Sequence, residues 1–399
     1  MAVVGFIMLM KDWKSFRISS HFSRLIRLFI SSVGVLFVIA VLSGAINANF
    51  DPFFYKFPIV LFISFSSAYC YIKLIAFIYN KEISNEVLIS FFVGAVLLQC
   101  FLSALIFVLP PFRAIIFGLV PMTEMNEFAV TNNIHPTEDV LFRMIPVGYD
   151  FWGNGTCFAI VIFFIALLIN HERNRNTFVI LLLLLVPIVV VGASISRTSL
   201  IGLPFFILYL MLSKGDRKNK KFLFNFSLIL IPITVFAYSL FLESNPMFEG
   251  IFERAFSLFY IFKDTGEMQS VESMVGQAVI PTDLKTWIIG DGLMSDPLNP
   301  GTGFYKGVDI GVWRLIWGVG LFGLLMFSIL QYLYIKLAGF YKLEAAILFI
   351  IYCAFMYKGI FYYDLIMSPF IALALFSVKN RRKSLHGSES SIVKDDCNS

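Results

Sequence analysis

Residues 287–325 read WIIGDGLMSDPLNPGTGFYKGVDIGVWRLIWGVGLFGLL. The stretch begins as a polar segment rich in glycine and proline and then becomes a long apolar run. An acid, Asp309, and a base, Arg314, lie where the change occurs. The pattern predicts a long loop that ends at the mouth of a membrane helix, with two charged residues at that mouth.

The composition of the whole chain supports a membrane protein. Of its 399 residues, 58% are hydrophobic and 14% are charged, and the mean hydropathy is +0.82. A water-soluble domain cannot bury that much apolar surface, so we expect the lipid bilayer to be the solvent. The net charge of +5 comes from short basic clusters between apolar runs, which does not indicate nucleic-acid binding. The cysteines lie in apolar runs or in the tail, so neither a disulfide framework nor a metal site is predicted.

Apolar runs long enough to cross a bilayer, or nearly so, recur along the chain. They predict an all-α polytopic membrane protein with about ten (ten to twelve) transmembrane helices. The two shortest runs, 199–213 and 343–357, fall well below the roughly 20 residues that a transmembrane helix needs. The full set is 25–45, 57–79, 87–109, 155–170, 177–194, 199–213, 222–242, 311–335, 343–357 and 359–378.

The lysines and arginines orient these helices. If the basic residues at 11–27 are cytoplasmic, strict alternation also places the clusters at 171–176, 214–221 and 379–383 on the cytoplasmic side. We therefore expect a single integral membrane domain over residues 1–399 with both termini in the cytoplasm. The polar end of the chain, 384–399, is expected to be a disordered cytoplasmic tail.

The same topology leaves two large loops on the outer side, 110–154 and 243–310. Both are rich in glycine, proline, asparagine and acids. Within the second loop, residues 250–262 carry apolar side chains at a spacing of three to four, with Arg254 among them. This pattern predicts an amphipathic helix that lies on the membrane surface.

The first candidate site residue is Arg197, in the turn GASISRTSL (192–200) between two apolar runs. One interpretation is an interface arginine whose side chain reaches the lipid headgroups. The other is an anion site, because guanidinium stays charged and its forked donors match phosphate oxygens. An arginine on the outer side runs against the usual cytoplasmic bias, which favours the anion site.

The second candidate is the quoted stretch. Gly290 and Gly292 flank Asp291, as a tight turn requires. Asp309 precedes the predicted helix 311–335 and either caps it or takes part in chemistry. Arg314 lies inside the apolar run, where an unpaired charge is costly, so we expect it to face a cavity or a partner.

Among the remaining charges of the outer side, Arg254 and Arg143 are the better candidates because each is embedded among apolar residues. His135 is followed by Pro136 and is weak evidence for catalysis. The chain has no Walker A sequence, no nucleotide fingerprint, no HExxH and no nucleophile elbow. Any chemistry is therefore expected at the outer face, without ATP, metal or another cofactor.

Several of these features together resemble the O-antigen polymerase (Wzy) family, within the O-antigen ligase and polymerase-like membrane glycosyltransferases. They are the S-x-S-R-T turn around Arg197, a long late loop with an Arg-bearing amphipathic helix, and the G-x-G turn at 290–292. An acid then precedes a helix that reads GVGLFG at 318–323. The recognisable pattern covers about residues 190–325, and the topology covers the whole chain.

The resemblance implies a glycosyltransferase of the bacterial inner membrane with a GT-C-like fold. Such enzymes join oligosaccharide repeat units carried on undecaprenyl diphosphate at the periplasmic face, and the lipid diphosphate leaves. Matching positions imply that Arg197, Arg314, Arg254 and Arg143 bind diphosphate and that Asp309 or Asp291 accepts the hydroxyl proton. The implied partners are the lipid-linked oligosaccharide, membrane lipid, a chain-length regulator and a flippase.

The chain also departs from the family pattern. The R-x10-G loop motif is absent, which leaves the assignment of the loop arginines open. The ligase pattern of a histidine followed by Asn, Ser or Gln is absent as well, which favours a polymerase over an O-antigen ligase. A repeat-unit flippase is the alternative from another class. Transporters usually have pseudo-repeated halves and short loops, and this sequence has neither.

Overall fold

The computed structural model describes residues 1–13, 20–49, 51–79, 83–119, 144, 146–147, 151–172, 174–213, 279–297 and 304–376. Within these ranges the chain is helical and forms no β-strand beyond one isolated bridge between Ser295 and Phe304. Six of the described helices are long and apolar enough to cross a membrane. The prediction of an all-α, membrane-embedded protein is therefore confirmed, whereas the predicted total number of spans stays a prediction.

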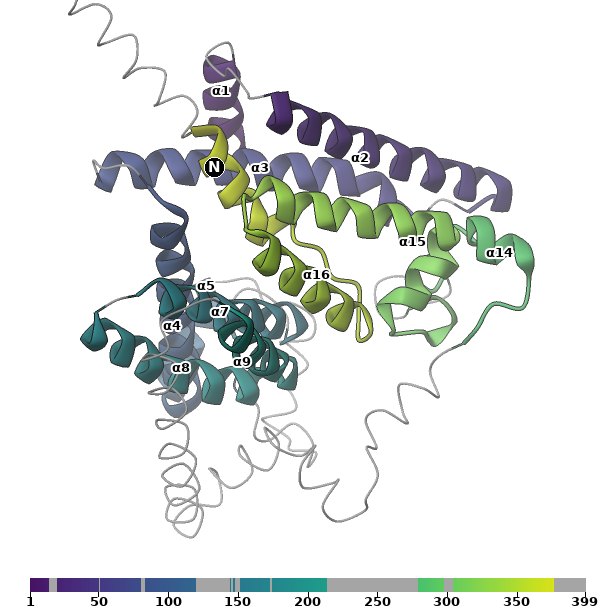
Figure 1. Ribbon diagram of the computed structural model, residues 1–399. Helices are drawn as coiled ribbons and strands as arrows, with labels where there is room; N and C mark the ends of the chain where they lie inside the picture. Colours follow the sequence, from purple (N-terminus) through teal and green to yellow (C-terminus); the bar gives the residue numbers. More distant parts are fainter. Residues whose placement is uncertain are drawn as a thin grey trace, which may run out of the picture. The chain divides into compact units, whose positions relative to one another are not determined.

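The long apolar runs of the sequence coincide with helices (Figure 1). The six that are long enough to cross a membrane begin with α2 (Ser20–Asn47), of which Ser23–Asn47 is the candidate span. The others are α3 (Pro52–Tyr79), α4 (Asn85–Val108), α7 (Phe151–His171), α8 (Arg175–Ile195) and α15 (Gly311–Leu337). Shorter ones are α16 (Lys342–Met356), η1 (Arg197–Ile201) with α9 (Gly202–Leu212), and a helix over Asp364–Phe376. The predicted helix 222–242 and the predicted surface helix 250–262 lie outside the described residues.

Contacts divide the chain into two compact units. Unit 1 comprises residues 1–88 and 272–399, and unit 2 comprises residues 89–271. In unit 1, α2 packs against α15 and α3, and α16 packs against α15 (Figure 1). Aromatic side chains also pack between helices of this unit: the ring centroids of Phe57 on α3 and Phe327 on α15 lie 5.6 Å apart, and those of Phe29 on α2 and Tyr334 on α15 lie 4.7 Å apart.

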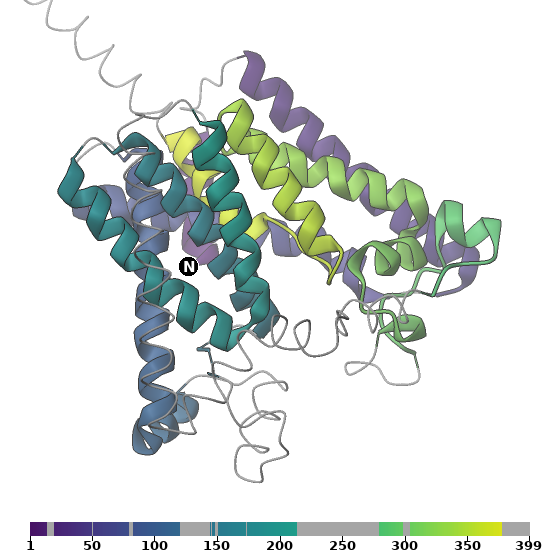
Figure 2. The same cartoon turned by 60° about the horizontal axis from the view of Figure 1, so that its bottom comes forward.

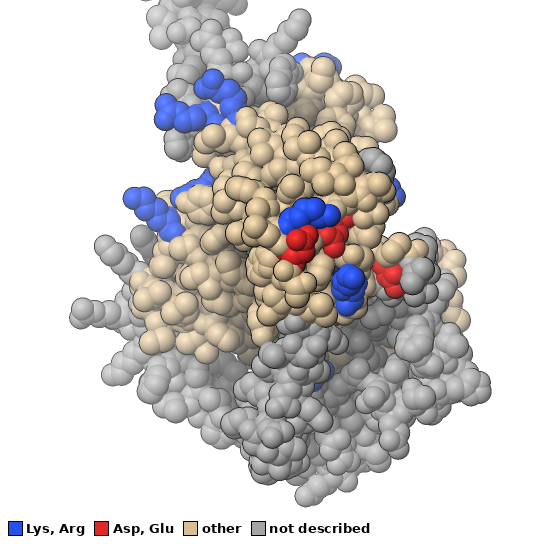
Figure 3. All heavy atoms as spheres, turned by 90° about the vertical axis from the view of Figure 1, so that its right-hand side faces the viewer, with Lys and Arg blue, Asp and Glu red and all other residues tan. Residues whose placement is uncertain are grey.

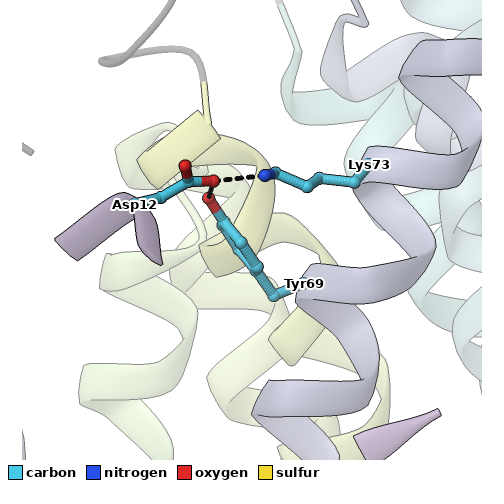
Figure 4. Close-up of polar contacts among 3 residues, drawn as sticks. All are labelled: Asp12, Tyr69 and Lys73. Atoms are coloured by element: carbon cyan, nitrogen blue, oxygen red, sulfur yellow. Dashed lines mark hydrogen bonds and ion pairs between the residues drawn. The ribbon is translucent and has the colours of Figure 1, made fainter. Parts of the chain in front are cut away.

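An N-terminal helix, α1 (Ala2–Trp13), packs against α3, and the sequence pattern did not predict it. At 12 residues it is about 18 Å long, too short to cross a bilayer. Polar contacts attach it: Asp12 forms an ion pair with Lys73 and accepts a hydrogen bond from the Tyr69 hydroxyl at 2.8 Å (Figure 4). Because Asp12 is buried, loss of Lys73 would leave an uncompensated charge in the interior.

Helix α15 is interrupted, whereas the sequence predicted one continuous helix over 311–335. Gly320 adopts φ 68° and ψ −174°, outside the helical region. The cause is a short helix of the preceding loop, α14 (Leu284–Ile289), which packs against α15. A Cβ atom at position 320 would lie 2.2 Å from the carbonyl oxygen of Ile288, so only glycine allows this approach.

The last described helix is also shorter than predicted. The sequence predicted helix 359–378, but residues 360–363 are not helical and the helix begins at Asp364. Other parts of unit 1 satisfy backbone donors of this segment. The Tyr363 N–H donates to Gln331 Oε1 at 2.7 Å, and the Phe361 N–H donates to the Met356 sulfur at 3.4 Å.

Unit 2 is built around α7, whose residues 158–167 are buried throughout. Helices α8 and α9 pack against it and lie beside it in teal in Figure 2. Small residues allow the close approach: a Cβ at Gly202 would lie 2.4 Å from the carbonyl oxygen of Ala159. The predicted outer loop 110–154 begins with a helix, α5 (Pro110–Leu119).

Candidate functional site

The glycine turn of the quoted stretch lies against the interrupted part of α15. Gly290 and Gly292 have φ values of 82° and 76°, which favour glycine. The Asp291 N–H donates to the Trp317 carbonyl at 2.6 Å, and the Gly292 N–H donates to the Gly318 carbonyl at 3.0 Å. These two carbonyls accept hydrogen bonds from the turn at the point where the break at Gly320 interrupts the hydrogen bonding within the helix. The two glycine motifs therefore form one structural unit.

The carboxylate of Asp291 holds this unit together. The Thr286 hydroxyl donates to Oδ1 at 2.7 Å, and the Tyr305 hydroxyl donates to Oδ2 at 3.1 Å. Burial of the phenol, followed by the nearby Asp291 charge and this hydrogen bond, raises the pKa of Tyr305 to about 12. Tyr305 therefore remains a neutral donor. Because both oxygens of Asp291 already accept hydrogen bonds, Asp291 is the less suitable of the two predicted bases.

A third element, the connection between α2 and α3, completes the turn. The side-chain amide of Asn47 donates to the Gly290 carbonyl at 2.9 Å, and that of Asn49 donates to the Asp291 carbonyl at 2.9 Å. Lys285 donates to Asn47 Oδ1 at 2.5 Å. These contacts join residues about 240 positions apart in sequence, so the residue pattern could not predict them.

Asp51 is the main residue of this region that the sequence analysis missed. It is 5% exposed, and its carboxylate accepts the backbone N–H groups of Phe53, Met294 and Ser295, each at 2.9 Å. The only signal in the sequence is the pair Asp51-Pro52 at the start of an apolar run, which is typical of a helix N-terminus. The structure adds the second role, which is to fix the loop at 294–295 next to α3.

Arg314 lies one turn inside α15, as predicted, and is half-buried. Its guanidinium carbon lies 3.7 Å from the centroid of the Phe304 ring, in a cation–π arrangement. The carboxylates of Asp309 and Asp51 are close enough to stabilise its charge electrostatically. Among the described residues, however, its side chain makes no hydrogen bond or ion pair, and its Nε atom is buried without a partner. Such a guanidinium retains donors for a further anionic group.

Asp309 lies two residues before the start of α15, with part of its side chain exposed. It is not the N-cap residue: Ile310 occupies that position, and no side chain caps the helix there. Partial burial of the carboxyl raises the pKa of Asp309, and the positive charges of Arg314 and Lys358 oppose this shift. A carboxylate with a raised pKa is a stronger proton acceptor.

Lys358 is a further residue that the sequence analysis missed. It lies between α16 and the helix Asp364–Phe376, and its charge acts on Asp309. This connection reaches the start of α15 because Gly311 packs against Gly359, where a Cβ atom at 311 would lie 2.3 Å from the carbonyl oxygen of Gly359.

We call Asp51, Asp291, Asp309 and Arg314 the rim cluster. On the side of the molecule that carries α14 in Figure 1, basic and acidic side chains lie next to each other (Figure 3).

Arg197 belongs to unit 2 and begins the 3-10 helix η1 between α8 and α9. It is half-buried, and its neighbours Ser196 and Thr198 pack against Gly155 of α7, where a Cβ atom would lie 2.7 Å and 3.2 Å from their side chains. The hydroxyl of Ser199 is buried and has no hydrogen-bond partner among the described residues. The turn is thus rigidly packed and polar, as an anion site requires.

The turn also receives a contact from the segment before α7. The Met144 N–H donates to the Ser194 carbonyl at 3.4 Å, while the Ser194 hydroxyl donates to Val190 within α8. The structure thus places Asp309 near Arg314 and holds Asp291 against the backbone of α15 at Trp317, all within unit 1, whereas Arg197 lies within unit 2. The other two predicted arginines, Arg143 and Arg254, lie outside the described residues.

Comparison of the chain with protein-family models, with curated proteins and with solved structures finds no match.

Proposed function

We propose that the protein is a lipid-diphosphate-dependent glycosyltransferase that polymerises oligosaccharide repeat units, an O-antigen polymerase of the bacterial inner membrane. The observation that carries the proposal is Arg314, a half-buried guanidinium at the start of a membrane helix, whose buried Nε has no partner among the described residues. Guanidinium donors match phosphate oxygens, and scarce water at that depth strengthens the attraction. A GT-C-like fold, a periplasmic site and cytoplasmic termini are parts of the same proposal.

The chemistry assigned to the rim cluster is a displacement at the anomeric carbon. The acceptor hydroxyl oxygen forms a bond to the anomeric carbon of the growing chain, and the bond from that carbon to the diphosphate oxygen breaks. The hydroxyl proton passes to Asp309, and the lipid diphosphate leaves with the electron pair. Arg314 stabilises the negative charge that develops on the leaving group, and Lys358 is a second cation whose charge acts on Asp309.

Deletion of the gene in its host tests this function. A polymerase mutant still displays single repeat units on the lipid core, because transport and ligation continue. A flippase mutant displays essentially no repeat units, and a ligase mutant accumulates polymer that is not attached to the core. Either of the last two outcomes would replace the proposed activity with that alternative.

A biochemical test uses the purified chain in lipid with lipid-linked repeat units. Polymer of increasing length should form without nucleotide, and undecaprenyl diphosphate should be released in proportion to the bonds formed. Arg314→Lys keeps the charge but loses the forked donors, so it should be strongly impaired. Full activity of Arg314→Lys would contradict the assigned diphosphate contact.

A further inference from the structure

A second polar site lies in the apolar interior of unit 1. The chain runs through residues 360–363 without helical structure, and the helix Asp364–Phe376 begins beside α3. The partner of Asp364 on α3 is Ser64, which lies near the middle of that helix. Non-helical backbone at membrane depth is tolerated only where protein buries it or where it lines a polar cavity. The backbone of residues 360–363 and the carboxyl of Asp364 therefore need polar partners from the surrounding protein.

Asp364 is a fully buried carboxyl, with 0% of its surface exposed. The Ser64 hydroxyl donates to its Oδ2 at 3.1 Å. Its other oxygen, Oδ1, is buried and has no hydrogen-bond partner among the described residues, and Asp364 forms no ion pair with any of them. Hydrogen bonds from Ser64 and from the backbone N–H groups of Asp364 and Leu365 offset only part of the cost of burying an ionised carboxylate without a counter-charge, and a proton removes that cost.

Gln331 of α15 provides an independent observation at the same place. It is 0% exposed, and its Oε1 accepts the N–H of Tyr363, the residue before Asp364. Its Nε2 is buried without a partner among the described residues, as is the hydroxyl of Ser368, one turn along from Asp364. The part of unit 1 where Gln331 contacts the backbone before Asp364 therefore contains an unpartnered amide donor, an unpartnered carboxyl acceptor and an unpartnered hydroxyl.

The groups that face Asp364 decide which ligand fits. From α15 the titratable neighbour is Tyr334, and from α3 the neighbour is the non-titratable Ser64. The titratable groups of α16, Tyr352 and Cys353, act on Tyr363 next to it. None of these is a cation. The amide N–H of Gln331 carries partial positive charge, which disfavours a metal cation and is compatible with a neutral acid and its hydrogen bonds.

We propose that Asp364, with Ser64, Gln331 and Ser368, forms an intramembrane site that binds a proton. The site lies apart from the rim cluster in sequence and takes no part in the bond exchange described above. Asp364 is protonated inside the membrane, whereas the proposed glycosyl transfer is assigned to the rim cluster. The inference does not depend on the identity of the substrate.

Infrared spectroscopy of the full chain in lipid tests the proposal. The difference between the spectra of wild type and Asp364→Asn should contain the C=O stretching band of one protonated carboxyl, and this band should disappear as pH rises. Its half-intensity pH should lie at least about one unit above the ordinary aspartate value of about 4. Identical spectra at every pH, or a half-intensity pH near 4 or below, would overturn the proposal.

Two further measurements define the site. Ser64→Ala removes a hydrogen bond that stabilises the ionised form, so the half-intensity pH should rise by roughly one unit or more. Ser32→Ala is the matched control, because the Ser32 hydroxyl is buried but donates within its own helix to Leu28 at 2.8 Å. An unchanged half-intensity pH in Ser64→Ala, or a shift in Ser32→Ala as well, would contradict the assigned site.

Replacement of choline by Na⁺ as the cation of the buffer should have no effect on the carboxyl band. A band that Na⁺ abolishes would identify a metal-cation site instead.

Discussion

The rim cluster of unit 1 and the turn at residues 194–199 of unit 2 each carry an arginine that the sequence predicts to bind phosphate, but they are built differently. At the rim, glycines with positive φ place a loop against the backbone of an interrupted helix, and acids stabilise Arg314 electrostatically. At the turn of unit 2, glycines of neighbouring helices allow Ser196, Thr198 and Ser199 to pack closely.

The two arginines therefore depend on different parts of the chain. Arg314 depends on backbone conformations that other residues cannot adopt and on contacts with distant loops. Arg197 depends on close helix packing, in which small side chains matter more than positive φ. Substitutions at the rim should therefore affect structure and chemistry separately, according to which residue is changed.

The largest effect is expected for Gly320→Ala. The new Cβ atom would lie 2.2 Å from the Ile288 carbonyl oxygen, and the φ of 68° would be strained, so α14 must move away from α15. We expect a destabilisation of about 3 kcal/mol or more, together with loss of polymer formation. Thermal unfolding of the purified protein in detergent measures this. Gly34→Ala is the control, because a Cβ atom there meets nothing within 4 Å and should change the melting temperature little. Equal melting temperatures for both variants would show that the rim does not require the glycine break.

The next largest effects concern the two arginines. Arg314→Ala and Arg197→Ala should each reduce the rate of polymer formation by about 10²–10³-fold or more, with the protein still present in the membrane, because each removes donors for the diphosphate. Rates with purified lipid-linked repeat units measure this. Arg175→Ala serves as the control, since Arg175 is exposed at the opposite end of α8 from Arg197. A fully active Arg197→Ala would assign that residue to membrane anchoring and leave diphosphate binding to the rim alone.

Substitutions of Asp309 and of Asp291 should have different kinds of effect. Asp309→Asn should retain binding of the lipid-linked substrate but lose about 10²–10⁴-fold in turnover, because the amide cannot accept the proton. Asp291→Asn should mainly lower thermal stability, since its carboxylate holds Thr286 and Tyr305. Binding and turnover measured side by side separate the two roles. Normal turnover in Asp309→Asn would remove it as the base.

The pH dependence of turnover gives a second test of Asp309. A base must be ionised, so the rate should rise with pH through the raised pKa of this carboxyl. Arg314 lowers that pKa, so Arg314→Ala should shift the acid limb of the residual activity to higher pH. A shift to lower pH, or none, would show that the two charges do not interact. Tyr71→Phe, at an exposed tyrosine of α3, should leave the profile unchanged.

The smallest effect is expected for Tyr305→Phe. The change removes one hydrogen bond to Asp291 and should destabilise the protein by about 1 kcal/mol with little effect on turnover. Chemical denaturation or thermal unfolding measures the loss, again with Tyr71→Phe as the control. A large loss of turnover at unchanged stability would indicate that the Tyr305 hydroxyl contacts the substrate.

The residue pattern was enough to predict a helical, membrane-embedded protein, because a helix that crosses a bilayer must be long, apolar and nearly free of charge. For the same reason it identified Arg314, a charge that interrupts an apolar run, and Asp309 at the start of the same helix. It also located the glycine turn around Asp291, since glycines that flank a polar residue are a local signal.

The surroundings of these residues, in contrast, follow from how the helices and loops pack. The break at Gly320, the hydrogen bonds of Asp291 and the contribution of Asp51 and Lys358 arise between segments that are far apart in sequence. The unwound segment 360–363 and the partners of Asp364 have the same origin, as Ser64 and Asp364 lie 300 residues apart. Apolar periodicity indicates which residues avoid water, whereas these contacts depend on which helices pack together, and a single sequence holds no direct signal for that packing.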